Sequence, residues 1–199
     1  MQNIKDNIRQ KLIAAGRKLV AEKGIEFLTA RKLSEASGCS IGTIYNQFAS
    51  MDELAAEQNR QTLCELEAVL DAESYGKDSY ANLNRIVDTF ACFVCDNREL
   101  WLLLYNFHLN RREYIPNIGY KRQLVKMMNY GARDFISLFP ALKGRRSRIM
   151  REVLTLGLFG ISAMLATDML SGLKTVNREN VCRIFSNAFL AGITLLDKE

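Results

Sequence analysis

Residues 29–50 read TARKLSEASGCSIGTIYNQFAS, and this stretch decides the fold of the N-terminal part of the chain. Thr29 is a suitable N-cap for a short helix over residues 30–37, because its side-chain oxygen can accept a hydrogen bond from a free backbone N–H. Gly38 can end that helix, since glycine tolerates a positive φ. Ser40 can cap a second short helix over residues 41–48. The pattern predicts two short helices joined by a sharp turn.

The two sides of the second short helix differ in character. Leu33, Ala36, Ile44 and Phe48 lie where the two short helices must pack on each other and on a preceding helix. The outward side is small and polar, and consists of Ser40, Ile41, Gly42, Thr43, Asn46 and Gln47. Such a side can approach base edges in a major groove. The arrangement predicts a helix-turn-helix that binds DNA.

The flanking sequence completes this unit. Ile8, Leu12, Ala15 and Leu19 recur at helical spacing, and Gly24 is a natural stop for the helix that they define. Ser50 can cap a longer helix that begins near residue 51. Residues 1–50 contain eight basic and four acidic side chains, a balance that suits a polyanionic partner.

Helical periodicity continues to the end of the chain. It predicts helices over residues 80–96, 99–110, 120–139, 144–171 and 177–197, with a loop over residues 111–119. No credible strand is found, so the fold class is all-α with about nine helices. We expect a DNA-binding domain over residues 1–50 and a helical effector-binding and dimerisation domain over residues 51–199.

Composition favours a soluble cytoplasmic protein. The chain is 48% hydrophobic and 25% charged, which is ordinary for a globular domain. Charges near the N-terminus argue against an export signal. Residues 153–170 approach the length of a membrane span, but they include polar residues and two glycines. We therefore expect them to form a buried core or interface helix.

The five cysteines do not indicate a disulfide framework or a metal site. Cys92 and Cys95 form a C-x-x-C pair without a second pair, and the chain has one histidine, His108, whereas zinc needs about four ligands. We expect the cysteines to pack as small apolar residues. Redox-sensitive thiols at Cys92 and Cys95 are the alternative, and no cofactor is expected.

Residues 29–50 resemble the DNA-binding signature of the tetracycline-repressor (TetR) family. The resemblance extends back to residues 13–15 and forward to Leu54, and it rests on the run Ser-x-Gly-Thr-Ile-Tyr-x-x-Phe-x-Ser. It implies phosphate or base contacts by Thr29, Ser40, Thr43, Tyr45, Asn46 and Gln47. We also expect Arg31, Ile41 and Gly42 at this interface.

Two positions depart from the family pattern. Members often carry a basic residue where this chain has Ile41 and Met51. Ile41 would then offer an apolar contact, such as one to a thymine methyl group. Arg9, Arg31 and Lys32 are candidates to replace the missing positive charge.

The resemblance implies a homodimer whose last two helices form a four-helix bundle. Small and apolar residues at helical spacing agree with this arrangement. The predicted interface residues are Gly157, Gly160, Ile161, Met164, Ile184, Phe185, Ala188 and Phe189.

The middle helices are rich in aromatic and methionine side chains. Most such residues form ordinary core, but the set could line an apolar effector pocket. The predicted pocket residues are Phe90, Phe93, Trp101, Tyr105, His108, Met127 and Tyr130. An uncharged or anionic apolar effector is favoured, because basic residues flank this region: Arg111, Arg112, Lys121 and Arg122.

The sequence therefore predicts a transcriptional repressor that binds a pseudo-palindromic operator as a dimer and is released by a small molecule. Two alternatives stay open: a thiol-based redox-sensing repressor, and an enzyme with a hydrophobic pocket. No nucleophile motif or phosphate-binding glycine loop supports the enzyme. The operator, the regulated genes and the effector are not written in the sequence.

Overall fold

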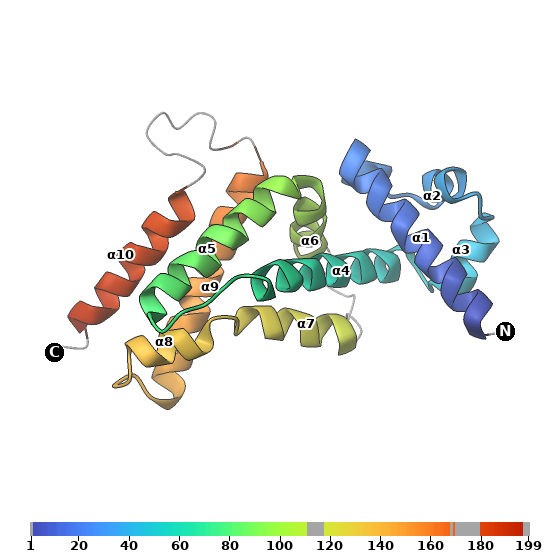
Figure 1. Cartoon of the computed structure of the whole chain (residues 1–199). Coiled ribbons are helices and arrows are strands. Elements are labelled where there is room, and N and C mark those ends of the chain that lie inside the picture. Colours follow the sequence, from blue (N-terminus) through green and yellow to red (C-terminus); the bar gives the residue numbers. More distant parts are fainter. Residues whose placement is uncertain (1, 111–117, 168, 170–179, 197–199) are drawn as a thin grey trace. The chain divides into compact units, whose positions relative to one another are not determined.

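The computed structural model describes residues 2–110, 118–167, 169 and 180–196, and within these ranges it contains helices and no strand (Figure 1). The predicted all-α class is therefore confirmed. In chain order the elements are α1 (Gln2–Lys23), the 3-10 helix η1 (Ile25–Phe27), α2 (Ala30–Ser37), α3 (Ile41–Gln47), α4 (Met51–Asp71), α5 (Ser79–Asp96), α6 (Arg98–Asn110), α7 (Ile118–Met128), α8 (Ala132–Leu138), α9 (Gly144–Ala166) and α10 (Val181–Leu196).

The chain divides into two compact units. The first comprises residues 1–64 and 97–124, and so holds α1, η1, α2, α3, α6 and the first parts of α4 and α7. The second comprises residues 65–96 and 125–199, with α5, α8, α9 and α10 as its complete helices. The functional division expected at residue 50 stays a prediction.

The core of the first unit is built from α1, α2 and α3. Leu12, Leu33 and Ile44 are fully buried, and Phe48 packs with them. Ile8 and Ala15 of the predicted stripe pack against this cluster. Burying this apolar surface against α1 gives the two short helices, α2 and α3, a stability that short helices lack in isolation.

The expected burial of Ala36 was wrong. Ala36 is exposed, and Ser37 is buried in its place. Ser37 lies four residues after Leu33 and therefore shares its face of α2, whereas Ala36 falls on the solvent side. The Ser37 hydroxyl also accepts a hydrogen bond from the backbone N–H of Cys39, which an alanine there could not do.

The core of the second unit surrounds α5, which contacts α8, α9 and α10. The buried cluster includes Leu83 of α5, Phe135 of α8 and Leu190 of α10. Asn82 ties the unit together: its Nδ2 donates to Asp134 Oδ1 (2.8 Å) and to the Gly76 carbonyl, and its Oδ1 accepts from the Gly76 N–H.

The helix predicted over residues 120–139 is two helices, α7 and α8, separated at residues 129–131. Gly131 has a φ of 75°, a left-handed conformation that α-helices do not contain. The chain is already helical at Ile118 and Gly119, so the loop expected there is also shorter. Residues 111–117 of that loop lie outside the described residues. Beyond the break, α8 ends at Leu138, one residue before the expected end at residue 139, and Pro140 follows.

The last two helices are shorter than the periodicity predicts. α9 ends at Ala166, where Thr167 adopts an extended conformation, five residues before the expected end. α10 begins at Val181. The predicted boundaries at residues 171 and 177 lie outside the described residues.

In the described part of the chain, α9 is long and apolar enough to cross a membrane by length and composition. One such helix is weak evidence for a span, because core helices of soluble proteins pass the same test. Only 22% of its most apolar window is buried in the single chain. Most of this apolar window is therefore exposed in the single chain, and α9 could bury it against a second chain.

Candidate nucleic-acid interface

Both short helices begin at the residues that the sequence indicated. The Thr29 side chain accepts a hydrogen bond from the Lys32 backbone N–H (3.3 Å), and Ser40 Oγ accepts from the Thr43 N–H (3.1 Å). Ser50 caps α4 in the same way, accepting from the Glu53 N–H. These bonds satisfy backbone donors that a helix leaves free at its first turn. The three capping predictions are confirmed.

The turn between α2 and α3 is held by serines. Gly38 is left-handed, with a φ of 67°, and its N–H donates to the Ser34 carbonyl. The Ser34 hydroxyl in turn donates to the Cys39 carbonyl (2.7 Å). A tight turn with its polar groups paired fixes the direction in which α3 leaves α2.

The outward side of α3 is the predicted DNA-reading surface. Ile44 and Phe48 are buried beneath it, whereas Ile41 is 45% and Tyr45 49% exposed. The remaining predicted residues are exposed or partly exposed: Ser40, Gly42, Thr43, Asn46 and Gln47. A Cβ added at Gly42 would meet only Ser40 Oγ, at 3.8 Å. The chain itself does not need a glycine there, which fits a requirement for close approach from outside.

Arg9 of α1 has a role that sequence reasoning missed. Its guanidinium donates to the Gln47 carbonyl and to Glu53 Oε1 (3.2 Å), and it lies 4.1 Å from the ring centre of Phe48. A cation at the C-terminal end of α3 complements the free carbonyl groups there. Arg9 therefore connects α3 to α1 and to α4, and its expected contribution of positive charge to the DNA interface stays a prediction.

Arg31 and Lys32 share one acidic partner. Arg31 Nε lies 3.3 Å from one carboxylate oxygen of Glu35, and Lys32 Nζ lies 3.0 Å from the other. These hydrogen bonds, Lys32 foremost, lower the pKa of Glu35, so the carboxylate stays ionised at neutral pH. All three side chains are exposed.

Met51, which stands where the family often has a basic residue, packs against the apolar core of the first unit. Ile41 at the other departing position is solvent-exposed. Of the two departures, only Ile41 therefore lies on the outward surface of α3.

Comparison with known proteins addresses the family directly. Residues 12–57 match the family model described as bacterial regulatory proteins, tetR family. The chain carries a DNA-binding domain of the TetR family at its N-terminal end. It is a DNA-binding transcriptional regulator, and the match covers the helix-turn-helix and the start of α4.

Solved structures of TetR-family and related proteins share the fold over nearly the whole chain. A protein of unknown function from Rhodococcus sp. RHA1 is 20% identical, with a TM-score of 0.72, covering 93% of this chain and 94% of that one. The fatty acid degradation regulator FadR from Bacillus halodurans is 14% identical, with a TM-score of 0.65 and coverages of 92% and 94%.

A third neighbour is FadR from Thermus thermophilus, a TetR-family transcriptional repressor solved in complex with lauroyl-CoA. It is 15% identical, with a TM-score of 0.66 and coverages of 93% and 94%. At these identities the likeness concerns the fold. No curated protein matches the chain by sequence.

The seven predicted pocket residues are distributed over both units, so a single pocket containing them stays a prediction. Phe93 and Trp101 are buried. His108 Nε2 is hydrogen-bonded to the Tyr120 hydroxyl (2.6 Å), and the two rings stack. The others are partly buried: Phe90, Tyr105, Met127 and Tyr130. Of the basic residues expected to flank this set, Arg111 and Arg112 lie outside the described residues, and Lys121 and Arg122 are exposed.

A groove of about 650 Å³ opens in the second unit at the break between α7 and α8. Its walls include Ile86 and Val125, and Tyr130 contributes a polar group. The Tyr130 hydroxyl donates to Asp71 Oδ1 (2.7 Å) at the end of α4, and burial and this carboxylate raise its pKa, so the hydroxyl keeps its proton. Arg133, which is exposed, adds positive charge to the lining.

The predicted dimer residues divide into two groups. Gly160, Met164, Ile184 and Ala188 are exposed. Gly157 instead faces Phe185 of the same chain, whose ring would lie 2.2 Å from an added Cβ, and Phe185 stacks on Phe189. Ile161 is partly buried. We name the exposed apolar residues of these two helices the apolar strip: Ile149, Val153, Leu156, Gly160 and Met164 of α9, with Ile184, Ala188, Ala191 and Leu195 of α10.

None of the five cysteines forms a disulfide. Cys92 is exposed, Cys95 is partly buried, and Cys182 is buried. Burial raises the pKa of Cys182 to about 12, so this thiol is not a reactive nucleophile at neutral pH. Among the described residues, no group of three or more potential ligands is arranged to hold a metal ion.

Proposed function

We propose that this TetR-family regulator is a repressor that binds a pseudo-palindromic operator as a homodimer and leaves it when an effector binds. The observation that carries the proposal is the outward side of α3, residues 40–47, which is small, polar and exposed above a fully buried core. Helix-turn-helix proteins place such a side in the major groove, with capped helix ends and hydroxyl groups near the phosphates.

The apolar strip supports a homodimer through α9 and α10. Its members recur at three- and four-residue spacing along both helices, and the two helices contact each other. Leu156 is 62% and Leu195 69% exposed, which is unfavourable for an isolated chain. A two-fold axis through this surface would present two reading helices to two half-sites, as operator symmetry requires.

The groove at the α7–α8 break supports small-molecule release. Its volume of about 650 Å³ is within the usual range for ligand sites. Its apolar walls and the positive charge of Arg133 suit an anionic apolar compound, and lauroyl-CoA, found in Thermus thermophilus FadR, combines these two properties. Release requires the effector to bind the DNA-incompetent state more tightly, by a few kcal/mol.

The proposal places the protein in the cytoplasm, where the operator is, and assigns it no catalytic step. His108, the only histidine, has its Nε2 occupied by the Tyr120 hydroxyl. A general base that used Nε2 would first have to give up this hydrogen bond.

The experiment compares two Gly/Ala-to-Leu exchanges in the full-length protein. Gly42→Leu fills open space on the reading side, so it leaves the fold intact and keeps α3 away from the groove. Ala21→Leu adds the same bulk at an exposed position of α1 outside that side. Operators selected from genomic DNA at low salt are then titrated by fluorescence anisotropy.

We expect the wild type and Ala21→Leu to bind with an affinity that falls steeply as salt rises, with a log–log slope of several units. Gly42→Leu should lose at least about a hundredfold in affinity while keeping the wild-type circular dichroism and oligomeric state. Equal binding by Gly42→Leu and Ala21→Leu would remove α3 as the reading element. Failure of the wild type to bind any duplex would remove the function itself.

A further inference from the structure

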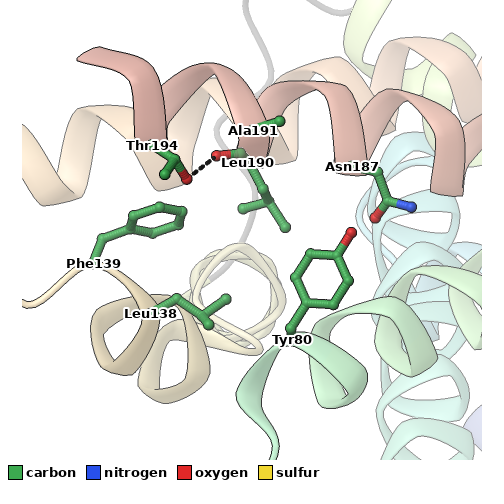
Figure 2. Close-up of a pocket in the computed structure, with 7 residues that line it drawn as sticks. All are labelled: Tyr80, Leu138, Phe139, Asn187, Leu190, Ala191 and Thr194. Atoms are coloured by element: carbon green, nitrogen blue, oxygen red, sulfur yellow. Dashed lines mark hydrogen bonds between the residues drawn. The ribbon is translucent and has the colours of Figure 1, made fainter. Parts of the chain in front are cut away.

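A second, smaller pocket lies in the second unit between α5, α8 and α10 (Figure 2). Its volume is about 180 Å³. Leu138, Phe139 and Leu190 form apolar walls, and Figure 2 shows their side chains gathered around one space. It shares no lining residue with the groove at the α7–α8 break. What binds here is therefore a question independent of the proposed effector.

One polar atom at this pocket has no partner. Asn187 Oδ1 is buried and accepts no hydrogen bond from the protein. The Thr194 hydroxyl is already committed, because it donates to the Leu190 carbonyl (3.1 Å). Tyr80 extends towards Asn187 from the opposite wall, and no hydrogen bond joins the two side chains (Figure 2). A buried carbonyl oxygen without a donor is costly, so a ligand that supplies a donor is favoured at this point.

The size of the pocket limits the ligand. Cavities of about 150 Å³ with leucine, isoleucine and phenylalanine walls hold one benzene ring. Larger effectors occupy pockets of about 300–1,000 Å³. A single six-membered ring with one substituent therefore fits, and a fatty acyl chain does not.

The lining also limits the charge of the ligand. None of the seven lining side chains carries a charge at neutral pH. Transferring a carboxylate or an ammonium group into such surroundings without a counter-charge is strongly unfavourable. The ligand should be neutral and should carry one hydrogen-bond donor.

We propose that this pocket binds a single-ring phenol. The ring lies against Leu138, Phe139 and Leu190, and the phenol hydroxyl donates to Asn187 Oδ1. The site is a binding site distinct from the DNA-reading surface and from the groove at the α7–α8 break.

The test titrates phenol and benzene separately into the full-length protein labelled at leucine and threonine methyl groups. The two ligands have nearly the same ring volume and differ by the hydroxyl. Phenol should shift the methyl signals of Leu138, Leu190 and Thr194, and it should bind about threefold to tenfold more tightly than benzene.

Asn187→Leu removes the acceptor and keeps the apolar walls. Asn187 Oδ1 has no partner in the protein, so its loss does not threaten the fold, and the preference for phenol should vanish or reverse. Asn84→Leu is the matched control, since Asn84 of α5 also has a buried oxygen without a partner but does not line the pocket. It should keep the preference for phenol.

A second variant guards against misfolding of the first. Leu138→Phe adds bulk inside the pocket and should weaken both ligands together. The proposal is overturned if phenol shifts signals elsewhere and not at the pocket, if Asn187→Leu keeps the preference of the wild type, or if Leu138→Phe binds both ligands unchanged.

Discussion

Arg9 of α1 contacts three groups of the helix-turn-helix and the start of α4. They are the carbonyl of Gln47, the carboxylate of Glu53 and the ring of Phe48. Nothing in the spacing of residues 1–50 indicates these partners, because they come from segments about 40 residues away. Sequence periodicity finds the face that α1 buries, whereas the target of a polar side chain at the edge of that face depends on tertiary packing.

Replacing Arg9 tests whether it acts by positioning α3 through its hydrogen bonds or only by its positive charge. Arg9→Lys keeps the positive charge but loses the planar group that reaches two acceptors. We expect it to lose about 1–2 kcal/mol of unfolding free energy and roughly tenfold in operator affinity. Urea unfolding and fluorescence anisotropy measure the two effects. Arg9→Lys binding and unfolding like the wild type would mean that Arg9 acts only as a charge. Lys11→Arg, at an exposed position of the same helix, is the control.

His108 makes stability depend on pH. Partial burial of its imidazole lowers the pKa of His108 in the folded protein below the usual value, although the residue as a whole stays exposed. As the pH falls below about 6.5, the unfolded chain takes up a proton that the folded chain resists, so stability present above that pH is progressively lost. Urea unfolding of the wild type should give a smaller free energy at pH 5.5 than at pH 7.5.

His108→Gln should remove most of this difference, since glutamine does not titrate. The pH range stays above 5 so that most carboxylates remain ionised throughout. The same decrease in both proteins would assign the effect to other groups.

At the scale of elements, helix starts were predictable and one internal break was not. Thr29, Ser40 and Ser50 are local signals that act within one turn, and each caps the helix expected of it. Gly131 gives no clear stop signal in the sequence, because one glycine in a periodic helix is often tolerated. Its effect comes from the second unit, where the chain turns close to Leu83 and Ile86 of α5.

The break at Gly131 should be sensitive to any side chain. An added Cβ would lie 3.0 Å from Leu83 and 3.1 Å from Ile86, and a φ of 75° is unfavourable for alanine. We expect Gly131→Ala to lower the unfolding free energy by about 1–3 kcal/mol. Gly76→Ala, with nothing within 4 Å of an added Cβ, should cost less. Thermal unfolding compares the two, and equal losses would contradict the strain at the break.

At the scale of the whole molecule, the apolar strip predicts how the chain assembles. Leu156→Glu and Leu195→Glu would each place a carboxylate in the proposed interface. We expect dimer dissociation to rise by about a hundredfold or more, because burying an unpaired charge costs several kcal/mol. Sedimentation equilibrium measures this change. Val69→Glu alters an exposed apolar residue of α4 outside the strip and should leave the dimer intact.

The sequence predicted the whole molecule unevenly. The helix-turn-helix and the resemblance to the TetR family followed from residues 29–50, where local spacing determines structure. The all-α class followed from helical periodicity along the whole chain. The apolar character of α9 and α10 was also visible, but which residues point outward was not. Phe185 turns inward onto Gly157, and that depends on how the two helices pack. The groove and the phenol pocket arise from several helices together and have no local signal.

The carboxylate of Glu35 lies between Arg31 and Lys32, and we expect this ion pairing to change how the regulator searches a chromosome. The phosphate backbone of any DNA duplex attracts a basic DNA-binding domain, regardless of sequence. This attraction lengthens the residence time of the protein on non-specific DNA. Because Glu35 forms ion pairs with Arg31 and Lys32, it weakens this non-specific attraction. We therefore expect a lower affinity for non-specific DNA and a faster transfer from non-specific DNA to the operator.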